Sequence, residues 1–265
     1  MSLWATKRKL IYLGIPILTL VILLTAFFFL IFYKKPTCFD GKKNSDETGI
    51  DCGGSCVILC TAETLDPIVH WSRVFRVTGN IYNAVAYIEN PNINSDAFNV
   101  PYSFKIYDSK DKTRLLLKRD GIAFIPKNKI FAIFEGPIDF SSSTPALQSD
   151  FQFTGKPVWI KDNNTLPEII IKDQSLSNEN KAPRIDATVS NNSLYPVSNI
   201  EVIAIVYEDK DRAIGASRTL VNTIPSAKSA SIVFTWPKPF EVGQESCTVP
   251  VDVMLAVDRS GSMAY

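Results

Sequence analysis

An uncharged run near the start of the chain limits where the protein can fold. Leu10 to Tyr33 reads LIYLGIPILTLVILLTAFFFLIFY and contains no charged residue. A helix of this length rises far enough to cross a hydrocarbon layer about 30 Å thick. A secretory signal peptide has a shorter apolar region and a small-x-small cleavage site, and neither is seen here. The run therefore predicts one transmembrane helix at residues 10–33, after a leading segment at residues 1–9.

The residues that flank this run indicate its orientation. Basic residues lie on both sides, and the cluster at 7–9 slightly favours a cytoplasmic N-terminus by the positive-inside rule. Four of the five cysteines lie just after the run, within a short loop-rich segment, which is typical of an oxidising compartment. We therefore expect a single-pass protein of the cell membrane, with residues 1–9 in the cytoplasm and the bulk of the chain outside it.

The charge balance excludes a function that depends on one dominant electrostatic partner. Lysine and arginine number 28 and the acidic residues 27, for a net charge of +1. A nucleic-acid-binding chain would carry a basic stripe, and the sequence has none. The apolar fraction of 46% is enough for two modest cores in addition to the helix.

A cysteine-rich segment follows the predicted helix at residues 36–61. Cys38, Cys52, Cys56 and Cys60 are separated by thirteen, three and three residues, among many turn-forming residues. The segment resembles a motif of exported bacterial proteins, C-x-D-G-x-x-N-G-x-E-T-x-x-D-C-G-G-x-C-x-x-C. Ser45 stands where Gly is usual, and the spacing from Cys56 to Cys60 is one residue longer than in the commonest form. The resemblance and the exported location favour a disulfide-bonded collar at the membrane surface.

Two alternatives for this collar stay open. Nearest neighbours favour the pairs Cys38–Cys52 and Cys56–Cys60, but four cysteines permit three pairings. A zinc site of four thiolates competes, although the paired C-x₂-C knuckles of zinc ribbons are missing. Ca²⁺ is a further possible ligand, since Asp and Asn supply the oxygens it prefers; the same residues also suit turn geometry. The candidate Ca²⁺ ligands are Asp40, Asn44, Asp46, Glu47 and Asp51.

An internal repeat of about one hundred residues follows the collar. AYIENP from Ala86 aligns with ATVSNN from Ala187, and Ile125-Pro126 aligns with Ile224-Pro225. This length is that of an immunoglobulin-like sandwich. Alternation with period two predicts strands, and residues 202–207 are apolar on both faces, as in a central strand. Outside the membrane run, no segment has a convincing helical period.

The order of motifs in each copy resembles small bacterial envelope sandwiches of the FxLYD or CARDB type. This resemblance implies one β-sandwich at residues 67–161 and a second at 167–246. The fold class we expect is mainly β, with an N-terminal transmembrane helix followed by two tandem immunoglobulin-like β-sandwiches. Cys247 is left without a partner by arithmetic.

The last residues form an apolar strand, Val251 to Val257, that runs into Asp258, Ser260 and Ser262. This pattern resembles the first strand and metal loop of a von Willebrand factor type A domain. It implies that these three residues are the first ligands of a metal-ion-dependent adhesion site for Mg²⁺. The family's later Thr and Asp ligands are not among the residues up to Tyr265. We therefore expect residues 250–265 to be a truncated start of that domain, poorly ordered without neighbouring strands, with weak or no metal binding.

Catalysis finds little support. The single histidine, His70, has no nucleophile and carboxylate marked beside it in the sequence, so no triad is indicated, and we expect a half-buried strand residue and no enzyme. Two functions remain open. The first is a membrane-anchored extracytoplasmic binding or adhesion protein with a protein or glycan ligand of unknown identity. The second is a non-catalytic envelope scaffold or spacer that acts through its sandwiches alone.

Overall fold

A computed structural model describes residues 3–32, 37–140, 144–162, 168–208, 212–240 and 251–257 of the chain. For residues 3–10, 31–32 and 251–257, this description is limited to the backbone. The chain divides into two compact units, residues 1–55 and 56–265. Its architecture is mainly β with one long N-terminal helix, which confirms the predicted fold class.

The first unit begins with helix α1 (Leu3–Phe32), which has no charged residue after Lys9. Over Ile11–Leu30 the mean hydropathy is 2.6, and none of these side chains is buried. The hydroxyls of Thr19 and Thr25 donate to the carbonyls of Pro16 and Val21, at 2.9 and 2.8 Å. These bonds satisfy both hydroxyls within the helix, as an apolar environment requires. By length and composition, α1 is a candidate membrane span.

The described part of the second unit holds a short 3₁₀ helix, η1 (Thr61–Glu63), and four antiparallel sheets. In the first sandwich, β1 (Ile68–Thr78), β2 (Ile81–Asn90) and β5 (Lys129–Asp139) form one sheet in the order β1-β2-β5. The opposite sheet has the order β4-β3-β6, with β7 also paired to β3. Its strands are β3 (Ser95–Tyr107), β4 (Leu115–Ile125), β6 (Gln148–Phe153) and β7 (Trp159–Lys161).

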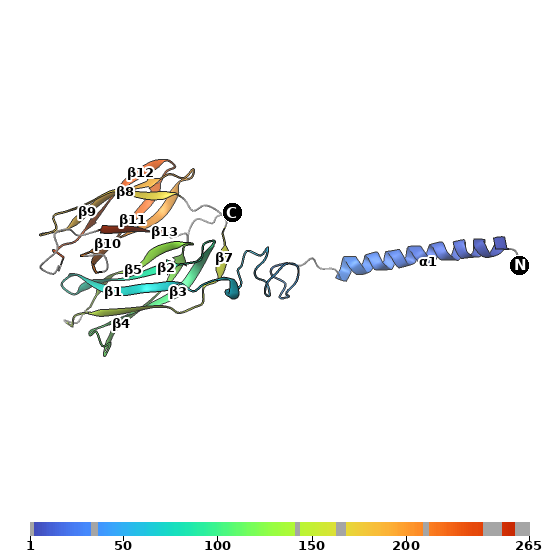
Figure 1. Cartoon of the computed structure of the whole chain (residues 1–265), viewed down its shortest axis with the longest axis horizontal. Coiled ribbons are helices and arrows are strands. Elements are labelled where there is room, and N and C mark those ends of the chain that lie inside the picture. The colour runs from blue at the N-terminus through green and yellow to red at the C-terminus, as the bar shows by residue number, and fades with distance from the viewer. Residues whose placement is uncertain are drawn as a thin grey trace. The chain divides into compact units, whose positions relative to one another are not determined.

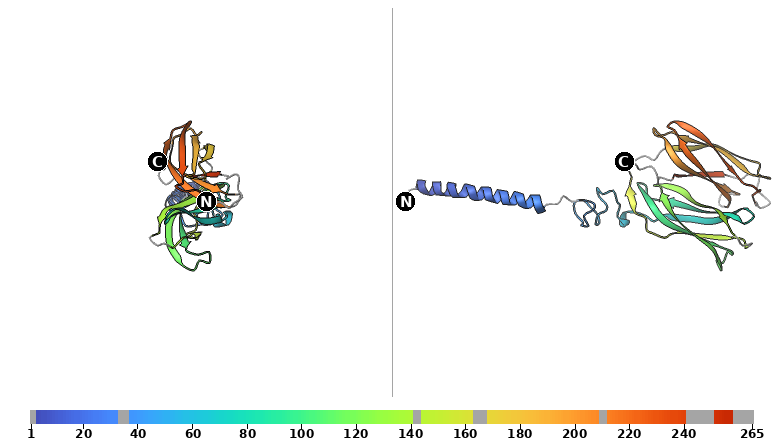
Figure 2. Two further views of the ribbon diagram at one scale, coloured as in Figure 1. Left: turned by 90° about the vertical axis from the view of Figure 1, so that its left-hand side faces the viewer. Right: turned by 180° about the vertical axis from the view of Figure 1, so that it is seen from behind.

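The second sandwich repeats this plan. One sheet has the order β12-β9-β8 and the other β11-β10-β13. The strands are β8 (Ile169–Ser177), β9 (Arg184–Asn191), β10 (Val197–Tyr207), β11 (Ala213–Ile224), β12 (Lys228–Thr235) and β13 (Val251–Val257). The two sandwiches lie side by side and not end to end, as the cyan-to-green and gold-to-red strands show in both figures (Figures 1 and 2).

A third apolar core joins the two sandwiches. Each sandwich has its own core, and a further cluster of described residues lies between the β1-β2-β5 sheet and the β11-β10-β13 sheet. Val85 of β2 and Phe134 of β5 meet Ile203 and Ile205 of β10 there. The four sheets therefore form four packed layers, and burial of apolar area across the middle holds the sandwiches together.

Strand β10 lies in the interior of this stack, which explains its composition. One set of alternate side chains enters the core of its own sandwich, namely Val202, Ala204 and Val206. The other set faces the first sandwich, namely Ile203, Ile205 and Tyr207. A strand that is buried on both faces reads as a continuous apolar run. The sequence-based prediction that this strand is apolar on both faces because it is central is confirmed.

The internal repeat has a structural cause in two equivalent asparagines. Asn90 ends β2 and Asn191 ends β9, and their side chains are 1% and 0% exposed. The Nδ2 of Asn90 donates to the carbonyl of Pro126 at 2.9 Å, and that of Asn191 to the carbonyl of Pro225 at 3.2 Å. Each buried amide therefore ties the end of one strand to the Ile-Pro turn before another. The aligned Asn and Ile-Pro pairs of the repeat are hydrogen-bonding partners.

Replacing Asn191 by Ala removes the three hydrogen bonds that its Nδ2 donates to the carbonyls of Tyr195, Ile224 and Pro225, at 2.8, 3.0 and 3.2 Å. It also removes the two that its Oδ1 accepts from the amide and hydroxyl of Ser193. Because the buried carbonyl of Ile224 loses its side-chain partner, we expect the free energy of unfolding to fall by about 1–3 kcal/mol. Urea denaturation in detergent measures this change. Asn222→Ala, at an exposed position of β11, is the matched control; an equal loss in both variants would contradict this role for Asn191.

Strand β13 overturns one expectation. Val251–Val257 was expected to lack neighbouring strands and to be poorly ordered, but it pairs antiparallel with β10, with Ala204 opposite Val253. In the first sandwich, β6 pairs in the same way with β3, with Phe104 opposite Phe151. The repeat makes β3 the counterpart of β10, so β13 takes the position in the second sandwich that β6 takes in the first. The backbone groups that we expected to be unpaired find partners on β10.

Candidate functional site

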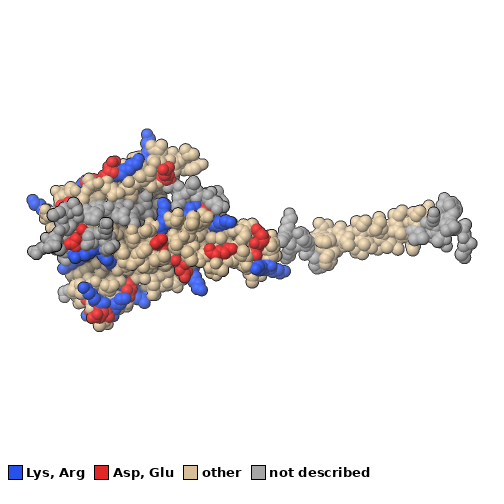
Figure 3. All heavy atoms as spheres, in the orientation of Figure 1, with Lys and Arg blue, Asp and Glu red and all other residues tan. Residues whose placement is uncertain are grey.

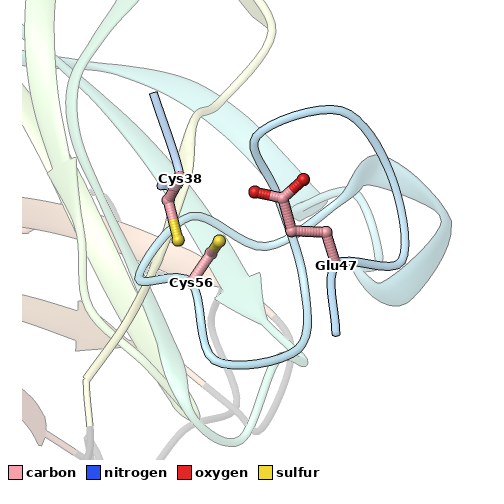
Figure 4. A group of neighbouring side chains, drawn as sticks. All are labelled: Cys38, Glu47 and Cys56. Carbon is pink, nitrogen blue, oxygen red and sulfur yellow. The ribbon is translucent and has the colours of Figure 1, made fainter. Parts of the chain in front are cut away.

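The four cysteines of the collar, Cys38, Cys52, Cys56 and Cys60, are all disulfide-bonded. The alternative of a four-thiolate zinc site is therefore wrong, because a disulfide sulfur is not a thiolate ligand. Figure 4 shows Cys38, Glu47 and Cys56, whose residue types could bind a metal ion; disulfide bonding of the two cysteines removes their thiolates from such a donor set. The pairing of Cys38 with Cys52 and of Cys56 with Cys60 stays a prediction.

Carboxylates of the collar accept hydrogen bonds from its own backbone. The Oδ1 of Asp51 accepts from the amides of Asp40 and Gly41, both at 3.0 Å. The amide of Asn44 donates to Oε2 of Glu47 at 3.1 Å. These contacts are those expected of Asp, Asn and Glu in tight turns. The turn-forming role of these residues therefore has direct support, and Ca²⁺ binding by them stays a prediction.

Two exposed carboxyls in the collar have lowered pKa values for the same reason. The side chain of Asn44 donates to Asp40 at 2.9 Å, and this bond lowers the pKa of Asp40. The hydroxyl of Ser55 donates to Oδ1 of Asp46 at 2.8 Å and lowers the pKa of Asp46. Hydrogen bonds to the ionised form favour that form. Both carboxylates are therefore charged at neutral pH while they hold the turns.

Ser45 occupies a backbone conformation that favours glycine. Its φ is 54°, in the left-handed region, and it is the position where the collar motif usually has Gly. A residue with a Cβ costs about 1–2 kcal/mol in that region. We expect Ser45→Gly to raise the temperature at which the collar loses its structure, in protein with intact disulfides. Hydrogen exchange of residues 38–55 against temperature measures this. An unchanged or lower unfolding temperature of the collar would show that contacts of the Ser45 side chain stabilise the collar at least as much as the backbone strain destabilises it.

The end of the collar is added to the edge of the first sandwich. Ile58 forms an antiparallel bridge with Ile160 of β7. The amide of Leu59 donates to the carbonyl of Trp159 at 3.0 Å, and the amide of Lys161 donates to that of Val57 at 2.7 Å. Trp159 is 3% exposed and belongs to the core of this sandwich. Residues 57–59 are therefore held by the same strand that closes the first sandwich.

The structure describes His70, but it does not describe the predicted metal ligands or Cys247. His70 lies on β1, and its Nε2 is 2.9 Å from Oε2 of Glu89 on the neighbouring strand β2. Both side chains are more than a third exposed, so this is a surface contact across two strands. The predicted metal ligands Asp258, Ser260 and Ser262 and the unpaired Cys247 lie outside the described residues. The strand that precedes these ligands, β13, is described and is paired.

A buried aspartate next to a second, partly buried one was not predicted from the sequence. Asp96 of β3 is 0% exposed and lies beside Asp162, while the Nζ of Lys127 is 3.4 Å from Oδ2 of Asp162. Burial raises the pKa of Asp96, and Asp162 raises it further, although the backbone amide of Lys127 donates to Oδ1 of Asp96 and opposes the shift. Single-sequence reading gives no signal for this pair, because its members are far apart in the chain.

The raised pKa of Asp96 predicts a pH effect. Burial favours the protonated form of Asp96 in the folded protein. The stabilising contribution of protonated Asp96 is therefore complete below about pH 4, and it is lost as pH rises through the folded-state pKa of Asp96. We expect Asp96→Asn, which keeps the shape without the charge, to lose less stability than the unchanged protein between pH 4 and 7. Urea midpoints across this range test it, with the exposed Asp66→Asn as control. Parallel profiles for Asp96→Asn and the unchanged protein would contradict the assignment.

Arg218 of β11 links the second sandwich to the first. Its guanidinium lies 5.0 Å from the ring centre of Phe134 and donates to the carbonyl of Gly136 at 3.2 Å, both on β5. On its own sandwich it forms an ion pair with Glu201 at 3.0 Å. These contacts add a cation–π interaction and a hydrogen bond to the apolar core between the sandwiches.

Beside Arg218 lies a cleft of about 470 Å³ with both polar and aromatic walls. Within it the hydroxyl of Tyr102 donates to Oε1 of Glu135 at 2.8 Å. Burial, and next this bond, raise the pKa of Tyr102, so the phenol stays protonated at neutral pH. The volume is in the range of small-molecule sites, and another cleft among the described residues also lies at the junction of the sandwiches.

Comparisons with known proteins give only distant likenesses. No protein-family model matches the chain, and no curated protein matches it. A red sea bream transglutaminase is similar at 8% identity and a TM-score of 0.23, over 70% of this chain and 31% of that one. The Bacteroides uniformis beta-glucuronidase 2, covalently bound to cyclophellitol-6-carboxylate aziridine, is similar at 9% identity and a TM-score of 0.21, over 63% and 22%. The chain thus spans less than a third of the length of these proteins.

Proposed function

We propose that the protein is a membrane-anchored extracytoplasmic binding protein whose stacked sandwiches present a metal-dependent adhesion domain. The observation that carries the proposal is the disulfide-bonded segment directly after the candidate membrane span. Disulfides persist in oxidising compartments, so this order of elements supports a chain that emerges from the membrane on its outer side. The resemblance of residues 251–263 to a von Willebrand factor type A domain supplies the adhesion part of the proposal.

The stack of four sheets suits a presenting role. The apolar core between the sandwiches and the contacts of Arg218 couple the two sandwiches, so they support whatever follows as one body. The strand that leads to the metal-loop residues is β13, and it is hydrogen-bonded to β10. A metal site that begins directly after β13 would therefore start from a fixed strand.

The test is Mg²⁺ binding by the protein made from the gene's full coding sequence, including any residues that follow Tyr265. Titration calorimetry is run in detergent, with Asp258→Ala as the variant and Asp252→Ala, on the preceding strand, as the matched control. The proposal predicts Mg²⁺ binding that Asp258→Ala abolishes and Asp252→Ala keeps. Absence of Mg²⁺ binding in the full-length protein would contradict the adhesion part.

A scaffold or spacer that acts through the sandwiches alone is the second candidate. The pairing of β13 favours it, because this strand completes the second sandwich in the way that β6 completes the first. In this case the interaction surface belongs to the sandwiches, and Mg²⁺ has no effect on binding. The same titration therefore separates the two functions.

A further inference from the structure

The other cleft at the junction of the sandwiches has a volume of about 570 Å³. Its walls come from β1 and residues 145–149 of the first sandwich and from the start of β11 and residues 236–240 of the second. The four cations in these walls are Arg73, Arg76, Arg212 and Lys238. Among the lining residues that the structure describes, none is an Asp or a Glu.

This concentration of one charge differs from the face of the molecule drawn in Figure 3. Figure 3 shows Lys and Arg side chains interspersed with Asp and Glu over the visible face. In the cleft, Arg212 has an acidic partner, Glu208 at 2.7 Å, and Arg73 lies 5.3 Å over the ring of Trp71. Arg76 and Lys238 are exposed, and no described acid lies within ion-pair distance of either. Like charges that converge in a cleft raise the local concentration of anions.

A buried donor in the same cleft points to a ligand. Trp236 is 5% exposed, and its Nε1 has no hydrogen-bond partner among the described residues. Gly215 lies beside it: a Cβ there would come within 2.7 Å of the Phe240 ring and would contact this nitrogen at 3.4 Å. Leaving a buried N–H without a partner lowers stability by about 1–3 kcal/mol. A ligand oxygen that accepts from this N–H would remove that cost.

We propose that this cleft binds an acidic polysaccharide through its carboxylate groups. Guanidinium groups match carboxylates with two parallel hydrogen bonds, and the indole N–H offers a further donor to an oxygen. Ser72, Thr78 and Gln148 also line the cleft and add partners for sugar hydroxyls. Because cations come from both sandwiches, the ligand lies across their junction. The site needs no metal and is independent of the adhesion domain.

Binding is measured by calorimetry on the whole chain in detergent, with EDTA present so that the result does not depend on Mg²⁺. The probe is polygalacturonate, with neutral dextran and poly-glutamate as comparison polymers. The proposal predicts that polygalacturonate binds, that dextran does not, and that affinity falls as salt rises. Equal binding of poly-glutamate would overturn the assignment to a polysaccharide, and no binding of polygalacturonate would overturn the site.

Paired variants locate the interaction. Arg76→Gln with Lys238→Gln removes two exposed cations from the cleft, whereas Lys172→Gln with Lys228→Gln removes two exposed cations from the outer sheet. We expect the first pair to weaken binding about tenfold or more, because charged hydrogen bonds are lost, and the second pair to leave it within about twofold. Equal weakening by both pairs would show attraction to net charge alone and would overturn the site.

Trp236→Phe distinguishes a ligand donor from a structural one. Phe keeps the aromatic packing against Phe240, whose ring centre lies 5.1 Å away, but lacks the N–H. If the N–H donates to the ligand, the variant binds polygalacturonate more weakly than the unchanged protein at a urea concentration where both are folded. Unchanged binding by the folded variant would contradict a role for this N–H in the cleft.

Discussion

Replacing Ile203 by Ala will lower the free energy of unfolding by about 2–5 kcal/mol, the range for a large-to-small change in a packed core. Ile203 is 0% exposed although it points away from the core of its own sandwich. Its surroundings are the side chains of the first sandwich, among them Val85 and Phe134. The lost burial therefore falls at the junction between the two sandwiches.

Ile203→Asp tests the same junction, with a larger expected loss of stability. A carboxylate buried there has no partner, so it either forces the sandwiches apart or unfolds the second one. We expect small-angle scattering in detergent to show a longer particle, or urea denaturation to show two transitions in place of one. Leu220→Asp is the matched control because Leu220, on the neighbouring strand β11, is 61% exposed. Tolerance of aspartate at both positions would contradict the stack of four sheets.

Deleting residues 251–265 is also expected to lower the stability of the second sandwich strongly. This deletion removes β13 and leaves one edge of β10 without its hydrogen-bonded neighbour. Each lost strand hydrogen bond costs about 1 kcal/mol, so the second sandwich loses several kcal/mol in total. An exposed edge strand also pairs readily with other chains, so aggregation is expected. Hydrogen exchange measures the loss directly, as faster exchange of the backbone amides of residues 197–207.

Deleting residues 258–265 alone is the matched control. It keeps β13 and removes the residues that resemble the metal loop. We expect this shorter deletion to retain slow exchange in β10, whereas the longer one does not. The pairing of β13 would be contradicted if the longer deletion exchanged as slowly as the shorter one.

Several features could be predicted from the sequence because their signal is local. The candidate membrane helix followed from a long run without charge, and the two equivalent sandwiches followed from a repeat of about one hundred residues. The central position of β10 could be predicted because residues 202–207 are apolar on both faces. In each case the physical constraint acts on neighbouring residues or at a fixed spacing.

The features that were missed depend on residues far apart in the chain. The apolar surface of β10 that faces away from its sandwich indicated burial, but nothing in the sequence specified that β2 and β5 would cover it. The cations of the 570 Å³ cleft lie at positions 73, 76, 212 and 238, so only the folded chain brings them together. The pairing of β13 was not predicted because residues 251–263 were assigned to a von Willebrand factor type A domain by resemblance. That assignment left β13 out of the repeat, in which it corresponds to β6.

The location of the folded part is tested most directly in spheroplasts that make the whole chain with an epitope tag at each end. Added protease should remove the C-terminal tag and leave the N-terminal tag intact, and the protein should sediment with membranes. Its four collar cysteines should react with an alkylating reagent only after reduction. A protein that stays in the soluble cytosolic fraction, with every thiol alkylated before reduction, would contradict the account of an outward-facing, membrane-anchored protein.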